Sequence, residues 1–174
     1  MQTVAPAESI TNHAGSLLSL FEEALEPRDP TGWSRWIQGE MRRFLPHDAM
    51  VAAWGDFRTG ALAYEVVASD GALRPHAIGK GAVERLMTRL YETWVASGQQ
   101  PIVVESSDLR AETPALADLS QCALAHGIED HRGRYDCVYL FLGPHELAGP
   151  VARQLCRIML PFIDTGFRQL PERP

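Results

Sequence analysis

The sequence contains no apolar run that could cross a membrane. A membrane helix needs about 20 consecutive apolar residues, and uninterrupted runs such as residues 49–54 are far shorter. The amino end carries Glu8 and lacks the basic start and apolar core of a secretory signal. These absences predict a cytoplasmic protein that makes no contact with a membrane.

Positive charge is also scarce. The chain has 16 Lys and Arg residues against 22 Asp and Glu residues, which gives a formal net charge of −6. A surface that binds duplex nucleic acid is normally basic, because it must neutralise phosphates. The two small basic groups, Arg42–Arg43 and Arg132–Arg134, are too short to supply such a surface. We therefore expect no nucleic-acid binding by this chain itself.

Cysteines are few and widely spaced, at Cys122, Cys137 and Cys156, with no CxxC pair and no Cys/His spacing for zinc. Buried free thiols are the expected interpretation. The segment from His126 to His131 could hold a metal only if its side chains converged, and alternation along a strand predicts that they diverge. The sequence predicts no metal site.

The common catalytic and cofactor motifs are missing. The chain has no GxSxG, no GxxxxGK[ST], no HExxH and no GxGxxG. We therefore predict no cofactor and no enzymatic activity. A small hydrolase that uses Ser106 or Cys137 with a histidine stays open as the weakest alternative, because no base lies close to either residue in sequence.

Helical periodicity predicts five helices along the chain. Apolar residues recur at steps of three and four, and Asp29-Pro30 supplies an N-cap with a proline in the first turn. Pro46 is expected to stop the second helix. The predicted helices cover residues 8–25, 30–45, 81–96, from 114 to just before Gly127, and 146–170.

Strands are predicted in two hairpins and one single segment. Alternating residues 51–57 and 62–67 flank a turn at residues 58–60, and residues 128–131 and 135–142 flank a turn at residues 132–134. Residues 102–105 form a further short strand. Successive hairpins imply an antiparallel sheet covered by helices. The expected class is α/β (α+β): a GAF/PAS-like α/β/α sandwich around a mostly antiparallel five-stranded sheet.

The last predicted helix has two apolar stripes. Val151, Leu155, Ile158 and Phe162 form one, and Met159, Ile163, Phe167 and Leu170 form the other. A helix with two apolar stripes usually has two packing partners. One partner is the domain's own sheet, and we expect the other to be a second copy of the chain. The first stripe is therefore the predicted interface of a homodimer.

Large amphipathic rings are numerous for so short a chain. Such rings most often fill a core, but several of them between a sheet and a helix layer could line an apolar ligand pocket with polar anchors. The candidate ligand-binding rings are Trp36, Trp54, Tyr64, Trp94 and Tyr139.

Three segments carry a family resemblance: WSRWIQGEMRRFLPHDAMVAAWGDF (residues 33–57), ALAHGIEDHRGRYDCVYLFL (123–142) and RIMLPFIDTGFRQL (157–170). Together they resemble the N-terminal domain of LuxR-type transcriptional regulators, and within that family the exopolysaccharide/exosortase-associated, EpsA-type subgroup. The resemblance implies a GAF-like sensory domain that dimerises and controls a C-terminal helix-turn-helix. DNA would then be bound only by that module, which is not in this chain.

The resemblance also points to Gln100. Members of the family that bind autoinducers carry an Asp-Pro whose aspartate receives the amide of the signal, and the nearest equivalent here is Gln100-Pro101. Gln100 can hydrogen-bond an amide but supplies no charge. Gln100 therefore joins the candidate ligand-binding residues, although the departure weakens the case for an acyl-homoserine lactone.

The expected organisation is a disordered tail at residues 1–7, a sensory and dimerisation domain at 8–170, and the start of a linker at 171–174. The predicted function is regulation of transcription, with a small apolar signal as the candidate ligand. The principal alternative is a protein-interaction module that binds no ligand.

Overall fold

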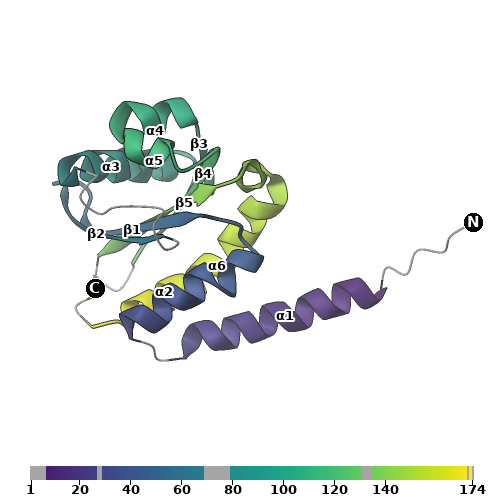
Figure 1. Cartoon of the computed structure of the whole chain (residues 1–174). Helices are drawn as coiled ribbons and strands as arrows, with labels where there is room; N and C mark the ends of the chain where they lie inside the picture. Colours follow the sequence, from purple (N-terminus) through teal and green to yellow (C-terminus); the bar gives the residue numbers. More distant parts are fainter. Residues whose placement is uncertain (1–6, 27–28, 69–78, 131–134, 172, 174) are drawn as a thin grey trace, which may run out of the picture.

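A computed structural model describes residues 7–26, 29–68, 79–130, 135–171 and 173, with the side chains given from Gly15 onward. A central sheet is covered by helices on both faces (Figure 1). The helices are α1 (Ala7–Leu25), α2 (Pro30–Gln38), α3 (Lys80–Ala96), α4 (Ser106–Glu112), α5 (Pro114–Ala117) and α6 (Pro150–Arg168), with short 3-10 turns η1 (Met41–Arg43) and η3 (His145–Ala148). The strands are β1 (Ala49–Asp56), β2 (Ala61–Ala68), β3 (Ile102–Val104), β4 (Cys122–Ile128) and β5 (Asp136–Gly143).

The sheet has five strands in the order β2-β1-β5-β4-β3, and every neighbouring pair is antiparallel. The two hairpins, β1–β2 and β4–β5, pair with each other through β1 and β5. β5 therefore lies in the middle and is buried on both faces, which explains its run of consecutive apolar residues. The expected fold class, an α/β/α sandwich on an antiparallel five-stranded sheet, is confirmed.

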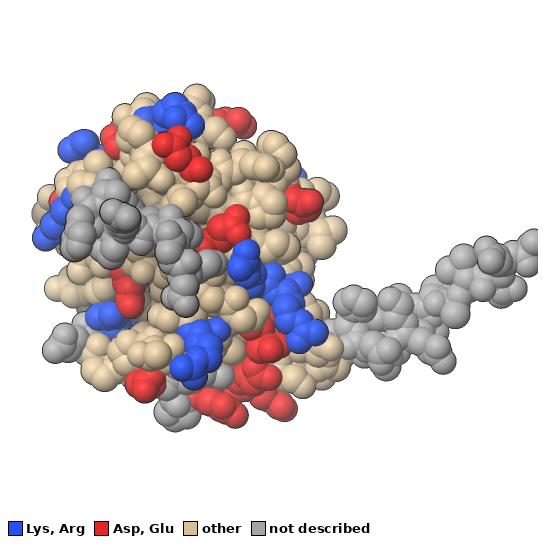
Figure 2. Space-filling view, in the orientation of Figure 1, with Lys and Arg blue, Asp and Glu red and all other residues tan. Residues whose placement is uncertain are grey.

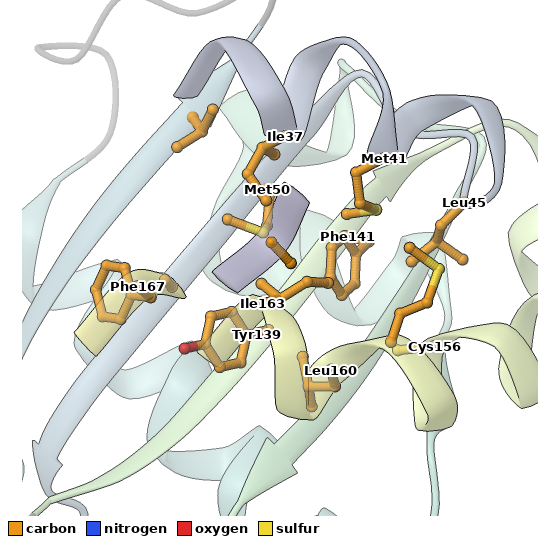
Figure 3. Packing of buried hydrophobic residues seen from close by; sticks show 14 of the residues in the cluster. Ile37, Met41, Leu45, Met50, Tyr139, Phe141, Cys156, Leu160, Ile163 and Phe167 are labelled. Atoms are coloured by element: carbon orange, nitrogen blue, oxygen red, sulfur yellow. The ribbon is translucent and has the colours of Figure 1, made fainter. Parts of the chain in front are cut away.

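One face of the sheet packs against α1, α2 and α6. Alternate residues of the central strands, such as Met50, Tyr139 and Phe141, meet Ile163 and Phe167 of α6 (Figure 3). α2 and η1 close the same core with Ile37 and Met41, which are fully buried. We call this layer the α6 layer. It contains the helix whose two apolar stripes stood out in the sequence.

The opposite face packs against α3, α4 and α5, and we call this the α3 layer. The sheet presents small side chains here, including Ala53, Ala123 and Ala125. Gly127 continues the same row, and a Cβ atom at this position would lie 2.7 Å from the ring of Trp94. These small residues let the α3 helix approach the sheet closely.

The second helix follows the sequence prediction at its start but not at its end. The Asp29 side chain accepts a 2.6 Å hydrogen bond from the Gly32 amide, as expected for an N-cap. The helix ends at Gln38, however, and the chain continues through Gly39 into the 3-10 turn η1. The expectation of one helix up to Pro46 was therefore wrong, because the helix already ends at Gly39, seven residues before the proline.

The predicted helix from Pro114 to Gly127 is also wrong. Only Pro114–Ala117 is helical, α4 precedes it, and Ala123 and Leu124 lie in strand β4. The predicted strand at residues 128–131 consequently begins earlier, at Cys122. The predicted turn at residues 132–134 lies outside the described residues, and so do residues 1–6 of the predicted tail at 1–7. The last residue of that predicted tail, Ala7, begins α1. Within the described part of the chain, no helix is long and apolar enough to span a membrane.

Candidate functional site

The six residues predicted to bind a ligand do not converge on one site. Trp36, Trp54 and Tyr139 belong to the α6 layer. Tyr64 and Trp94 lie on the α3 side of the sheet, where Tyr64 packs against the core and the Trp94 ring covers Gly127. Gln100 is exposed in the turn after α3, with its amide donating to the Gly98 carbonyl. The sheet separates the two groups of rings.

The α3 layer is closely packed. Val83, Leu86 and Met87 of α3 are fully buried, and so are Leu109 and Leu116 from the helices beside it. Five depressions formed by described residues lie at the surface, around α1, α2, the end of α6 and the ends of the hairpins. One of them reaches the rim of this layer at Phe57 and Tyr91, and none of the five is lined by Val83, Leu86 or Met87. A ligand between α3 and the sheet would therefore have to displace side chains of the core.

Trp94 and His126 form a buried polar pair at the edge of the sheet. The indole Nε1 donates a 3.0 Å hydrogen bond to Nδ1 of His126, so the imidazole is unprotonated at Nδ1. Burial, assisted by the nearby charge of Arg157, lowers the pKa of His126 to about 4. The pair fixes the end of α3 against β4 and keeps this histidine neutral.

Tyr91 supplies a second polar contact at the rim of the α3 layer. Its ring stacks on Phe57 at 4.4 Å between centroids, and its hydroxyl donates a 2.7 Å hydrogen bond to Asp136. Burial and the carboxylate of Asp136 raise the pKa of Tyr91 to about 12. The sequence analysis did not single out Tyr91, because neither its stacking on Phe57 nor its bond to Asp136 can be read from the spacing along the chain.

The most polar cluster of the described core lies in the α6 layer. Asp164 of α6 accepts a 2.7 Å hydrogen bond from the Tyr139 hydroxyl and another of 2.7 Å from Nε of Arg168. Arg168 also contacts Asp130 at 3.4 Å, and it donates to the Tyr135 carbonyl at 3.0 Å. The three charged side chains are each only 9–12% exposed. The cluster therefore ties α6 to β5 through Tyr139 and to Asp130, which follows the end of β4.

This cluster offers no activated nucleophile. The Cys137 thiol lies 3.2 Å from the Arg168 guanidinium, but burial and then the charge of Asp164 raise the pKa of Cys137 well above its usual value. The Ser106 hydroxyl donates to the Gln121 carbonyl. Neither residue bonds a histidine that the structure describes, so the described residues offer no support for the hydrolase alternative.

Metal binding finds no support in the described residues either, which contain no group of three or more His, Cys, Asp and Glu side chains placed to hold an ion. His126 is engaged with Trp94, and Asp130 is engaged with Arg168. His131, the other end of the candidate segment, lies outside the described residues.

The predicted dimer stripe of α6 divides into exposed and covered residues. Val151 is 70% exposed and Ile158 is 42% exposed. Leu155 is partly buried, and Phe162 stacks on Phe21 of α1 at 4.1 Å between ring centroids. Leu18 of α1 is 63% exposed. Helix α1 thus covers part of the stripe and contributes an apolar residue of its own.

Charges of both signs are interspersed over the face of the molecule seen in Figure 2, and blue side chains there lie beside red ones. The described residues form several ion pairs, such as Arg42 with Asp48 and Arg43 with Glu40. Paired charges of this kind do not create the basic surface that nucleic acid requires.

The buried charges of the α6 layer escaped the sequence reasoning. Asp164 and Arg168 are four residues apart on a helix, a spacing that forms ion pairs. The available signal was the position of Asp164 beside Ile163 and Phe167, because a carboxylate that borders an apolar stripe needs a buried partner.

No protein-family model matches the chain, and no curated protein matches it. Among solved structures, the chain resembles the N-acylhomoserine lactone dependent LuxR family transcription factor CepR2 from Burkholderia cenocepacia. The TM-score is 0.55 at 13% identity, and the match covers 88% of this chain and 92% of that one. The VqsR ligand-binding domain from Pseudomonas aeruginosa matches with a TM-score of 0.47 at 13% identity, over 91% of this chain and 98% of that one. The chain therefore has an α+β fold like that of LuxR ligand-binding domains, with helices on both sides of a five-stranded antiparallel sheet.

Proposed function

We propose that this chain is the regulatory domain of a LuxR-type transcriptional regulator, acting in the cytoplasm as a sensor and dimerisation module. The observation that carries the proposal is the fold shared with CepR2 over nearly the whole of both chains. The domain spans residues 8–170, residues 171–174 begin a linker, and DNA is bound only by a module outside this chain. Assignment to the EpsA-type subgroup, with a role in exopolysaccharide regulation, remains a prediction from the sequence.

The exposed apolar residues of α6 support dimerisation. Val151 and Ile158 lie two turns apart on one side of the helix, and both are more exposed than apolar residues usually are. Leu18 of α1 adds to the apolar surface. We propose that α6, with Leu155 and Phe162 at the margin of the contact, packs against α6 of a second copy.

Ile158→Glu is expected to convert the dimer into a monomer, because the carboxylate would lose its water at the centre of the contact. Sedimentation equilibrium at micromolar concentrations measures the change. Val95→Glu is the matched control, since Val95 is an exposed apolar residue of α3 on the other layer. A wild-type chain that is monomeric at these concentrations would remove the dimerisation proposal.

A small apolar signal is the proposed ligand, and CepR2, whose fold this chain shares, is described as dependent on N-acylhomoserine lactone. We place its binding between α3 and the sheet, where Ala53, Ala123 and Ala125 leave the smallest side chains. Because this layer is closed, binding requires α3 to separate from the sheet, and the signal selects that open state. The margins of this proposed binding site are formed by Tyr64, Trp94 and Tyr91.

Titration with N-acylhomoserine lactones and fatty acids of graded chain length tests the signal. The alanine methyl resonances of Ala53, Ala123 and Ala125 are expected to shift together with a saturable rise in melting temperature. Ala52, on the α6 side of the same sheet, is the internal control and should not shift. Equal shifts on both faces would contradict the proposed location.

A ligand-free protein-interaction module is the second candidate function. The packed α3 layer favours it, because that core has no space of its own for a ligand. Absence of any methyl shift and of any change in melting temperature, with the dimer intact, would select this function over sensing.

A further inference from the structure

The carboxyl end of the described chain folds back onto the sheet. α6 ends at Arg168, and the Arg173 amide then donates to the Leu170 carbonyl at 3.3 Å. The Arg173 guanidinium lies 5.2 Å from the ring centroid of Trp54 and 5.6 Å from that of Phe167. It also pairs with the Glu65 carboxylate of β2. We call these four residues, Arg173, Glu65, Trp54 and Phe167, the Arg173 clasp.

The clasp is more than a surface ion pair. The side chains of Arg173 and Glu65 are only 18% and 21% exposed, so water screens their attraction poorly. The Trp54 and Phe167 rings meet edge to face at 5.1 Å and form the wall on which the guanidinium rests. Cation–π attraction strengthens as the cation loses water. Three elements, β1, β2 and α6, thus hold one side chain.

β2 is an edge strand that bonds to β1 only, whereas β1 bonds to both β2 and β5. Its two faces look into different layers: Glu65 pairs across with Ala52 on the α6 side, whereas Tyr64 pairs with Ala53 and packs in the α3 layer. Tyr64 and Glu65 are consecutive residues of β2. A change in the packing of the α3 layer that moves Tyr64 therefore also moves Glu65.

We propose that the Arg173 clasp is a conformational latch that couples the α3 layer to the chain beyond α6. With β2 in the described position, Glu65 and the two rings hold Arg173 and fix the direction of the chain after the helix. Displacement of β2 from the α3 side withdraws Glu65, and the segment that contains Arg173 is released. The coupling needs no ligand and no dimer, so it stands apart from the proposed sensory function.

Hydrogen exchange and NMR of the full chain test the latch. Arg173→Ala would remove the side chain whose resonances are measured. The primary variants are therefore Glu65→Gln and Trp54→Leu, which change its partners. We expect the Arg173 amide to exchange about tenfold faster in Trp54→Leu, with a smaller increase in Glu65→Gln, where the rings remain. The ring-current shift of the Arg173 side-chain protons should be lost in Trp54→Leu. Arg153→Ala, at an exposed position of α6, is the control and should change neither measurement.

Tyr64→Ala tests the coupling itself, because it loosens β2 on the side away from the clasp. We expect faster exchange at Arg173 although none of the four clasp residues has changed. Leu20→Ala truncates a buried side chain of α1 in the α6 layer, and it controls for general loss of stability. Equal exchange at Arg173 in wild type and Tyr64→Ala, or an equal increase in Leu20→Ala, would overturn the latch. Either result would leave dimerisation and signal binding untouched.

Discussion

Arg168→Met is expected to lower the free energy of unfolding by about 3–5 kcal/mol. The substitution keeps an unbranched, apolar side chain at the end of α6 but removes the cation that Asp164 and Asp130 share. Both carboxylates are about nine-tenths buried, so they would be left without their cation in a poorly solvated site. Removing one partner of a buried pair is far more damaging than replacing the whole pair.

Urea denaturation at pH 7 measures the loss. Arg153→Met is the matched control: the residue lies on the same helix, but it is exposed, and its replacement should change stability by less than about 0.5 kcal/mol. Combining Arg168→Met with Asp164→Leu should recover part of the loss, since one uncompensated carboxylate is then gone. A loss below about 1 kcal/mol in Arg168→Met would show that the cluster is solvated.

Element type was predictable where periodicity and turn chemistry agreed. The β1–β2 hairpin follows from strict alternation on both sides of a turn with a glycine at positive φ, Gly60. The start of α2 follows from the Asp29 cap. The long α3 and α6 helices follow from apolar residues at steps of three and four over more than four turns. In each case the local signals and the final packing favour the same structure.

Strand β4 shows why the remaining elements could not be assigned. Leu116, Leu119, Ala123 and Leu124 have the spacing of a helix face, and Pro114 supplies a start. The same segment also alternates Cys122, Leu124 and His126 with small residues, which suits a strand. Pairing with β3 and β5 decides between the two, and such long-range contacts override weak local preference.

The candidate site depends on which face of the sheet each ring occupies. Trp54 pairs across with Ala63, whereas Tyr64 pairs with Ala53. The two rings are thus one residue out of step across the hairpin and lie on opposite faces. Sequence reasoning identified both as strand residues but had no means to fix the register. It therefore collected into one pocket residues that the sheet keeps apart.

Stability is expected to fall steeply on acidification because two buried histidines must stay neutral. His47 is fully buried, and its Nδ1 donates to the Leu45 carbonyl at 2.7 Å. Its Nε2 has no hydrogen-bond partner among the described residues. Burial is the main reason that the pKa of His47 falls from 6.5 to about 4. A proton on His47 would enter a site without an acceptor, and one on His126 would break its bond with Trp94.

The direction in which stability changes with pH follows from the protons that each state binds. Between pH 6.5 and about 4 the unfolded chain binds protons at both histidines and the folded chain does not, so acidification favours unfolding. The stability that comes from keeping the two histidines neutral is fully present above pH 6.5, and it decreases as the pH falls toward 4. A shift of about 2.5 pKa units corresponds to a loss of up to about 3 kcal/mol for each histidine.

Urea denaturation at intervals between pH 7.5 and 4 gives the slope, which should approach uptake of about two protons on unfolding. Asparagine can reproduce the Nδ1 contact of either ring, as a donor at residue 47 and as an acceptor at residue 126. His47→Asn and His126→Asn should therefore each reduce the slope by about one proton. His145→Asn, at an exposed position, is the matched control. If neither buried variant flattens the slope, the acid sensitivity arises from the carboxylates, and the two imidazoles accept protons in the folded chain.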